Sequence, residues 1–232
     1  MHSHVLILAC LALGACRAPE VDDASTPLVA ASNFLHPPFS SHGPDGRPVG
    51  IEVDIVDAAA RDLGREVEWL ELPFGELLAA VAEGSVDVAA ATIGITPERA
   101  RSVAFSVPYF ETTIVALARI GDGEPQTLDA LSGRRVGTDR GTTAVGAAAA
   151  RIPDAVRVLE RPATGTWAEL LSSGAVDAVV LDRSHAEKFM GDAGTRFHVI
   201  AEPLKVERFA IAVRPGAGEL RAALDAAIAA HD

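Results

Sequence analysis

The chain has 232 residues, 49% of them hydrophobic, and its 32 acidic and 20 basic residues give a formal net charge of −12. This acidity argues against a nucleic-acid partner and against adhesion to anionic lipid headgroups, because both kinds of binding require a basic surface. Length and composition otherwise fit a soluble α/β protein that forms one large domain or two small lobes.

The N-terminus predicts export and lipidation. Residues 5–13 form an apolar stretch that is too short to span a bilayer but is typical of a signal-peptide core. Leu13-Gly14-Ala15-Cys16 then has the pattern of a bacterial lipobox, whose Cys receives lipid after cleavage. Because no Lys or Arg precedes the apolar stretch, an ordinary secretory signal or an uncleaved anchor stays an alternative. We expect a lipoprotein signal peptide over residues 1–15, lipid on Cys16 and a tether over residues 16–26.

The first half of the remaining chain alternates between strand-like and helical segments. Residues 51–63 carry apolar side chains at helical spacing, and residues 86–90 lack polar alternation, which predicts a strand buried on both faces. The predicted order is strand 28–31, helix 51–63, strand 67–70, helix 74–83 and strand 86–90. Such alternation indicates a parallel sheet flanked by helices.

A helix start is predicted near residue 96. Thr96 is a favourable N-cap, and Pro97 suits the first helical position. Arg99 then places a cation in the first turn, where the helix dipole disfavours it unless an anion lies beside it. A guanidinium group with N–H groups and hydroxyls nearby suits a carboxylate, which it binds through two hydrogen bonds. Arg99 is therefore either part of an anion site or a surface residue that tolerates its position.

The second half repeats the alternation. Strands are predicted over residues 114–119, 136–139, 157–159, 178–181 and 208–213, and helices over 142–151, 166–173 and 183–190. The helical sequences 74–78 and 167–171 are similar, and each leads through a Gly to a buried strand. This partial repeat indicates two lobes with the same element order, although coincidence between common αβ units gives the same pattern.

Polar residues follow two strands of the second half. Asp182 comes directly after residues 178–181, at the carboxyl end of a strand, where ligands of open parallel sheets bind. Its carboxylate can accept hydrogen bonds from an ammonium group or cap the helix that follows. Thr142 and Thr143 follow Gly141 at a predicted helix N-terminus, where they can bind a carboxylate or simply cap the helix.

Motifs along the whole chain after the signal peptide resemble family 3 of the bacterial extracellular solute-binding proteins, the periplasmic binding proteins for amino acids. They comprise Gly50-Ile51-Glu52-Val53-Asp54-Ile55, residues 92–99 with 106–110, residues 131–137 with 141–144, and residues 208–213. The resemblance implies an α/β, two-lobed periplasmic-binding-protein fold of type II, with a mainly parallel sheet flanked by helices in each lobe and a two-strand hinge. Lobe 1 would comprise residues 27–115 with 207–232, and lobe 2 residues 116–206.

The resemblance also assigns roles at the two ends of an amino acid. It implies that Arg99, the hydroxyls of Thr143 and Thr142, and the N–H of Gly94 bind the α-carboxylate. Gly94 stands where the family often has Ser, so only its backbone can act. The α-ammonium group would be bound by Asp182 and by a carbonyl or hydroxyl oxygen of Thr92.

Three further positions match the part of the family's pocket that contacts the ligand side chain. Phe74 would pack on that side chain, although an aromatic residue at a helix start often staples the helix to the core instead. Asn33 and His36 belong to a loop where the family usually has an acidic residue and an aromatic residue. Asn33 therefore disfavours Lys or Arg as the ligand, unless an acidic residue from another segment, such as Glu111 or Glu160, reaches the pocket.

The expected function is a non-enzymatic receptor that delivers an amino acid to the permease of an ABC transporter. We expect a monomer without cofactor or metal, in the periplasm or at the cell surface, attached to a membrane through its lipid. Two alternatives are an enzyme similar to cyclohexadienyl dehydratases and a free-standing amino-acid sensor. The dehydratases have a Glu shortly after the position of Asp182, where this chain has Ser184 and His185, with Glu187 following nearby.

Overall fold

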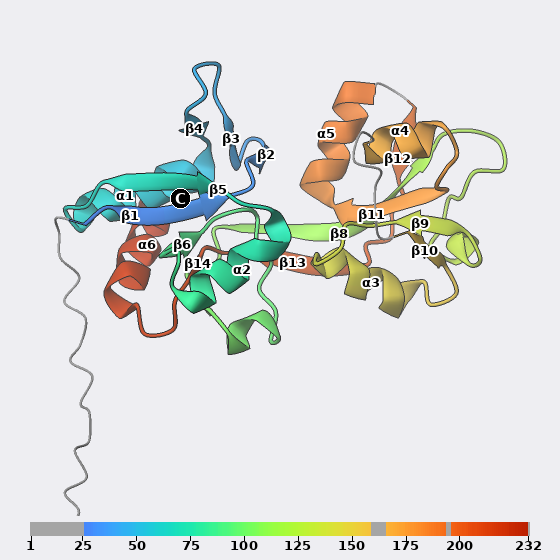
Figure 1. Ribbon diagram of the computed structural model, residues 1–232. Coiled ribbons are helices and arrows are strands. Elements are labelled where there is room, and N and C mark those ends of the chain that lie inside the picture. The colour runs from blue at the N-terminus through green and yellow to red at the C-terminus, as the bar shows by residue number, and fades with distance from the viewer. Residues whose placement is uncertain (1–25, 159–165, 194–195, 232) are drawn as a thin grey trace, which may run out of the picture.

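A computed structural model describes residues 26–158, 166–193 and 196–231 and has two lobes, each built on its own β-sheet (Figure 1). The α/β, two-lobed fold implied by the sequence is therefore confirmed. The predicted signal peptide and lipidation site, Cys16 included, lie outside the described residues. Within the three described ranges, no helix is both long enough and apolar enough to cross a membrane.

Lobe 1 is organised around a five-stranded sheet. Its strand order is β5-β1-β6-β14-β7, made of β5 (Val67–Glu71), β1 (Leu28–Ser32), β6 (Val88–Ala89), β14 (Ala212–Val213) and β7 (Ala104–Phe105). The first three strands are parallel, and β14 is antiparallel to both of its neighbours. A smaller antiparallel sheet follows β1 and consists of β2 (Leu35–His36), β3 (Ser40–His42) and β4 (Pro48–Val49).

Helices cover both faces of this sheet. Helices α1 (Ile51–Asp62) and α6 (Gly218–His231) pack against one face through apolar residues that include Ile55, Val56 and Leu224. Helix α2 (Phe74–Glu83) packs against the other face through Leu77 and Val81. The apolar spacing that predicted these helices therefore corresponds to the faces that they bury.

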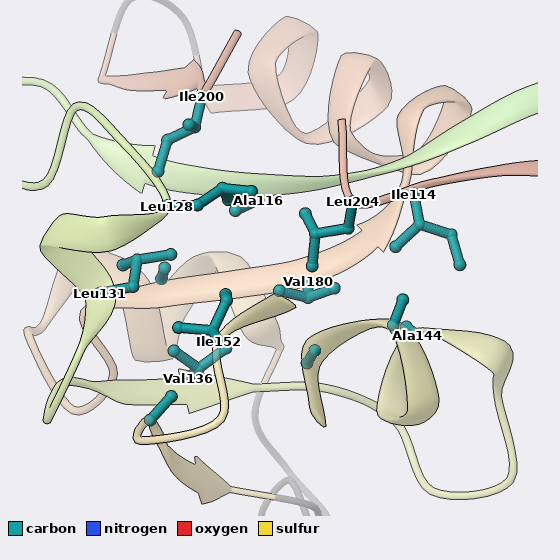
Figure 2. Close-up of a cluster of buried hydrophobic side chains, with 14 of the residues drawn as sticks. Ile114, Ala116, Leu128, Leu131, Val136, Ala144, Ile152, Val180, Ile200 and Leu204 are labelled. Carbon is teal, nitrogen blue, oxygen red and sulfur yellow. The ribbon is translucent and has the colours of Figure 1, made fainter. Parts of the chain in front are cut away.

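Lobe 2 has the same layered plan. Its strands are β10 (Val156–Val158), β9 (Arg135–Gly137), β11 (Ala178–Asp182), β8 (Phe110–Arg119) and β12 (Phe197–Val199), in that order. Alternate residues of β8 enter opposite cores, since Ile114 packs on the side of α3 (Thr143–Arg151) and Val115 on the side of α4 (Trp167–Ser172). Figure 2 shows the first of these cores, where side chains of β8, β11 and α3 gather. Helix α5 (Arg183–Ala193) and the short 3₁₀ turn η2 (Asp129–Leu131) complete the lobe.

Two adjacent strands connect the lobes. β8 and β13 (Lys205–Phe209) pair antiparallel, from Lys205 opposite Ile114 to Phe209 opposite Phe110, and run side by side from one lobe to the other (Figure 1). The predicted limits of the lobes, at residues 115 and 207, fall within these strands. The cleft between the lobes therefore has a two-strand base.

Two predicted elements are corrected by the structure. The strand predicted over residues 208–213 is two strands, because β13 pairs with β8 whereas β14 joins the sheet of lobe 1. The helix predicted from Thr96 is only the 3₁₀ turn η1 (Arg99–Arg101). The N-cap residue of this turn is Glu98 and not Thr96 as predicted, although the Thr96 hydroxyl oxygen accepts a hydrogen bond from the Arg99 N–H at 3.1 Å.

Replacing Gly137 by alanine should destabilise lobe 2 by about 1–3 kcal/mol, because its environment leaves no room for a methyl group. A Cβ atom at Gly137 in β9 would lie 2.3 Å from the ring of Trp167, which is 2% exposed. Thermal unfolding of the variant checks this, with Gly146→Ala as the control because a Cβ atom there meets nothing within 4 Å. Equal melting temperatures for the two variants would contradict the packing argument.

Candidate functional site

The predicted site residues lie where strands of the two sheets end. In lobe 1, Asn33 follows β1, Phe74 follows β5, and Thr92 follows β6. In lobe 2, Thr142 and Thr143 follow β9, and Asp182 is the last residue of β11. The carboxyl edges of both parallel sheets therefore face the cleft, which is the usual position of ligands in such sheets.

A single cavity of about 1160 Å³ brings these residues together. Its lining includes all nine residues predicted from the sequence, namely Asn33, His36, Phe74, Thr92, Gly94, Arg99, Thr142, Thr143 and Asp182. The volume slightly exceeds the range of roughly 300–1,000 Å³ that is common for small-molecule sites. A small ligand would therefore gain contacts if the lobes moved closer together.

Arg99 reaches from lobe 1 to lobe 2. Its Nη1 donates a hydrogen bond to the carbonyl oxygen of Gly94 at 2.7 Å, and its Nη2 donates one to the carbonyl oxygen of Gly141 at 2.9 Å. Its guanidinium carbon lies 5.6 Å from the ring centroid of Phe74, within cation–π range. Burial lowers the pKa of Arg99, whereas the negative charges of Glu207 and Glu98 raise it. A cation is thus held in the cleft wall.

Thr92 has a strained backbone that a buried carboxyl group supports. Its φ angle is 49°, a conformation that is unusual for a β-branched residue. The Thr92 N–H donates a hydrogen bond to Oε1 of Glu52 at 2.7 Å, and the Tyr109 hydroxyl donates to the same oxygen at 2.5 Å. Glu52 is fully buried, which raises the pKa of its carboxyl group. The acidic residue Glu52 in the first turn of α1 therefore orients a cavity residue on another segment.

Asp182 supplies a negative charge on the lobe 2 side. It accepts hydrogen bonds from the Ser184 hydroxyl, from the His185 N–H at 3.1 Å and from the His185 ring nitrogen Nδ1 at 2.6 Å. Burial opposes its ionisation, but these hydrogen bonds and the charge of His185 lower the pKa of Asp182 to about 2. Asp182 therefore caps helix α5 and also presents a charged carboxylate to the cavity.

The two neighbouring threonines have different hydrogen bonds. The Thr142 hydroxyl donates to the carbonyl oxygen of Asp139 at 2.7 Å, so Thr142 makes no side-chain cap although it is the N-cap residue of α3. The Thr143 hydroxyl donates to Oε1 of Glu207 on the hinge strand β13. Thr143 therefore already contacts a carboxylate.

His36 covers the cleft rather than projecting into solvent. Its ring centroid lies 3.8 Å from that of His185 in lobe 2, and its Nδ1 lies 3.3 Å from Oδ1 of Asn33. Burial and the neighbouring His185 lower the pKa of His36 to about 3, with Lys188 adding to this and Asp182 opposing it. His36 is therefore neutral at physiological pH.

The position of Phe74 fits both of its predicted roles, contact with a ligand and packing against the core. It lines the cavity, and it also packs against the apolar cluster beneath α2 that contains Leu77 and Val81. The helix staple and the contact with a ligand are therefore compatible.

Sequence reasoning missed several titratable residues that line the cavity, namely Glu71, Asp139, Arg140, His185, Lys188 and Glu207. The expectation allowed for an acidic residue from another segment, and Glu71, Asp139 and Glu207 do line the cavity besides Asp182. Glu111 lines a separate, smaller pocket together with Glu187, and Glu160 lies outside the described residues. Glu207 could have been found from strand alternation, because it shares a face of β13 with the buried Phe209.

Among the described residues, the side chains that line the cavity do not form a metal site. In the part of the chain that the structure describes, no group of three His, Cys, Asp or Glu side chains is placed to hold one. The charged groups of the cavity include Arg99 from lobe 1, Asp182 from lobe 2 and Glu207 from the hinge. This arrangement suits a small ligand that carries charges of both signs.

Known proteins with similar sequences are solute-binding proteins. Residues 28–232 match the family model described as bacterial extracellular solute-binding proteins, family 3. The chain is 31% identical over 230 residues to the L-arginine-binding protein of Pseudomonas aeruginosa, covering 96% of this chain and 88% of that protein. It is 29% identical to the L-cystine-binding protein TcyJ of Escherichia coli, covering 90% and 79% of the two chains.

Solved structures of amino-acid-binding proteins have a similar fold. The arginine-bound form of truncated ArgBP from T. maritima superimposes with a TM-score of 0.78 at 29% identity, covering 88% of this chain and 96% of that one. An ancestral arginine-binding protein bound to glutamine has a TM-score of 0.77, also at 29% identity, and covers 88% and 91%. The relatives and structures named here are binding proteins.

Proposed function

The chain belongs to the bacterial extracellular solute-binding proteins of family 3, and from this premise we propose that it captures an α-amino acid in its interlobe cleft and delivers it to an ABC-transporter permease. Membership places it outside the cytoplasm and identifies it as a binding protein rather than an enzyme. The observation that carries the proposal is the single cavity in which Arg99 of lobe 1 and Asp182 of lobe 2 are both exposed to a ligand.

The two charged groups suit the two ends of an amino acid. Arg99, the Thr143 hydroxyl and the backbone of Gly94 would bind the α-carboxylate, and Asp182 with Thr92 would bind the α-ammonium group. A carboxylate has about four lone-pair positions, so the hydrogen bonds from Ser184 and His185 leave capacity on Asp182 for the ammonium group.

Ligand binding would favour closure of the cleft. We propose that lobe 1, residues 27–115 with 207–232, and lobe 2, residues 116–206, move about the paired strands β8 and β13. A ligand stabilises the closed state only if it binds that state better than the open one, and contact with both lobes provides this difference. The protein would act as a monomer, because each chain contributes both walls of its cavity.

The ligand side chain would face Asn33, His36 and Phe74. We propose that a polar uncharged side chain binds better here than that of Lys or Arg. Glu71 also lines the cavity, but its side chain is 63% exposed and bonds to His42, so its charge is screened by solvent. Lys188 on α5 adds a positive charge that opposes a cationic ligand.

A thermal-shift screen of residues 17–232 against the twenty amino acids and prephenate tests the proposal. A ligand present at 100 times its Kd stabilises the folded protein by about 2.7 kcal/mol, which corresponds to a rise of about 5–10 °C for a chain of this size. We expect one or a few amino acids to give such a rise and prephenate to give none. A screen in which no amino acid raises the melting temperature would contradict the proposed function.

We further propose that the mature protein is a lipoprotein anchored through Cys16, because Leu13-Gly14-Ala15-Cys16 has the lipobox pattern. Wild-type cells fed radioactive palmitate should show a labelled protein in the membrane fraction, whereas Cys16→Ala should take up no label. Cys10→Ala is the matched control, since Cys10 lies within the predicted signal peptide. Equal labelling of the Cys16→Ala variant and the wild type would exclude this anchor.

A further inference from the structure

The carboxylate of Glu207 lies in the part of the cavity that is equipped to bind a carboxylate. Its Oε1 accepts the hydrogen bond of the Thr143 hydroxyl. The same oxygen lies beside Gly94, because a Cβ atom built at that glycine would be only 1.8 Å away from it. Burial raises the pKa of Glu207 and lowers that of Arg99, and the opposite charges of the two groups act against both shifts.

We propose that Glu207 sets the affinity of the cleft by occupying the ligand's α-carboxylate site in the ligand-free protein and competing with the ligand for it. This inference rests on the proposed amino-acid-binding function. It assigns to the hinge strand β13 a direct part in ligand capture, since the ligand must displace a side chain of the hinge to reach Thr143.

The absence of a side chain at residue 94 makes this arrangement possible. Any residue with a Cβ atom there would collide with the Glu207 carboxylate, whose Oε1 and carbon would lie 1.8 Å and 2.6 Å from it. Gly94 and Phe209 form an isolated antiparallel bridge, so the turn after β6 is held against the end of β13. The small residue at position 94 and the acidic residue at position 207 are therefore complementary in space.

The position of Glu207 favours competition over pairing with a cationic ligand side chain. Its neighbours Thr143, Gly94 and Arg99 are the groups that would bind the ligand's carboxylate, whereas Asn33, His36 and Phe74 would face the ligand side chain. An anion at the carboxylate site excludes a second anion from that site, because like charges in close contact repel.

Effects of opposite sign act on the competition between Glu207 and a ligand. Glu207 is tethered to the site, so its binding loses no translational entropy, which favours it over a free ligand. Burial, together with the charge of Asp182, opposes its ionisation and raises its pKa, although Thr143 and Arg99 act in the other direction. A zwitterion neutralises Asp182 through its ammonium group and so has an advantage that Glu207 lacks.

Titration calorimetry with L-glutamine and L-arginine tests the proposal in the whole mature chain. Glu207→Ala should bind the better of these two probes at least about tenfold more tightly than the wild type does, because removing the competitor frees the Thr143 hydroxyl and takes away a negative charge near Arg99. Glu207→Gln, which keeps a hydrogen-bond acceptor but has no charge, should fall between the two. The C-terminal amide of the same probe, which has no carboxylate, should show no gain.

Glu111→Ala is the matched control, because Glu111 lies on the other hinge strand, opposite Arg208, and lines the separate pocket. It should bind the probe as the wild type does. Unchanged or weaker binding by a folded Glu207→Ala variant would overturn the competitor role, and so would an equal gain for the amide.

A measurement without ligand separates this inference from the proposed function. If Glu207 occupies the site in the ligand-free protein, Thr143→Val and Glu207→Ala disrupt the same bond. Their combined loss in melting temperature should therefore be smaller than the sum of the single losses. Additive losses would overturn the inference even if amino acids bind. Failure of every amino acid to bind would overturn the proposed function, but the comparison of melting temperatures would still test the contact between Glu207 and Thr143, because it uses no ligand.

Discussion

Replacing Arg99 by alanine should weaken amino-acid binding by about 2–5 kcal/mol, the usual effect of removing one partner of a buried charge pair. The variant leaves the ligand carboxylate without its cation. The site is shielded from solvent, as the lowering of the Arg99 pKa by burial indicates. It also removes the hydrogen bond to the carbonyl oxygen of Gly141, which connects the lobes. Titration calorimetry with the amino acid selected by the thermal screen measures this loss.

The control for this variant lies two residues further on. Arg101 belongs to the same 3₁₀ turn and is exposed, so Arg101→Ala should leave the affinity unchanged. Arg99→Lys should keep the charge but lose the planar, two-pronged geometry, and its affinity should fall between those of the wild type and Arg99→Ala. Normal binding by a folded Arg99→Ala variant would show that the carboxylate binds elsewhere.

Asp182→Ala is expected to weaken binding by a similar amount, about 2–5 kcal/mol, because the ligand's ammonium group would be buried without a counter-ion. The low pKa of Asp182, about 2, means that its carboxylate is charged throughout the physiological range. Asp182→Asn keeps the size of the side chain and one oxygen acceptor, so it separates loss of charge from loss of packing. We expect calorimetry to show a large loss for both variants.

A role limited to capping helix α5 would give a different result. Asp182 accepts the His185 N–H hydrogen bond, and Asn is also a favourable N-cap. If capping were its only role, Asp182→Asn would bind the amino acid as the wild type does, and Asp182→Ala would lose stability without losing affinity. Either result would remove Asp182 from the ammonium site.

Local sequence signals identified most of the secondary structure. The helix predicted over residues 74–83 is α2 with the same limits, and the apolar spacing of residues 51–63 corresponds to α1. These signals are reliable because helix propensity, capping and apolar periodicity act between residues that are close in the chain. Asp182, Thr142 and Thr143 could be predicted for a related reason, since ligands gather at the carboxyl ends of parallel strands and these ends follow from the strand assignments. The roles of the other candidate residues were predicted from the resemblance to the family.

The tertiary structure alone decided the features that depend on pairing between distant segments. The predicted strand over residues 208–213 is divided because one part pairs with β8 and the other with β6 and β7, a choice that no local propensity encodes. The contact between His36 and His185 likewise requires the two lobes to face each other.

The position of the Glu207 side chain in the candidate site also depends on pairing between distant segments. The sequence by itself indicated two α/β lobes, with Asp182 at a strand end and Arg99 at a helix start, and it placed Glu207 only beside a predicted hinge strand. The register of β13 on β8, with Glu207 opposite Thr112, directs this carboxylate into the cavity beside Thr143 and Gly94. A shift of one residue would turn its side chain to the other face of the strand, because side chains alternate along a strand.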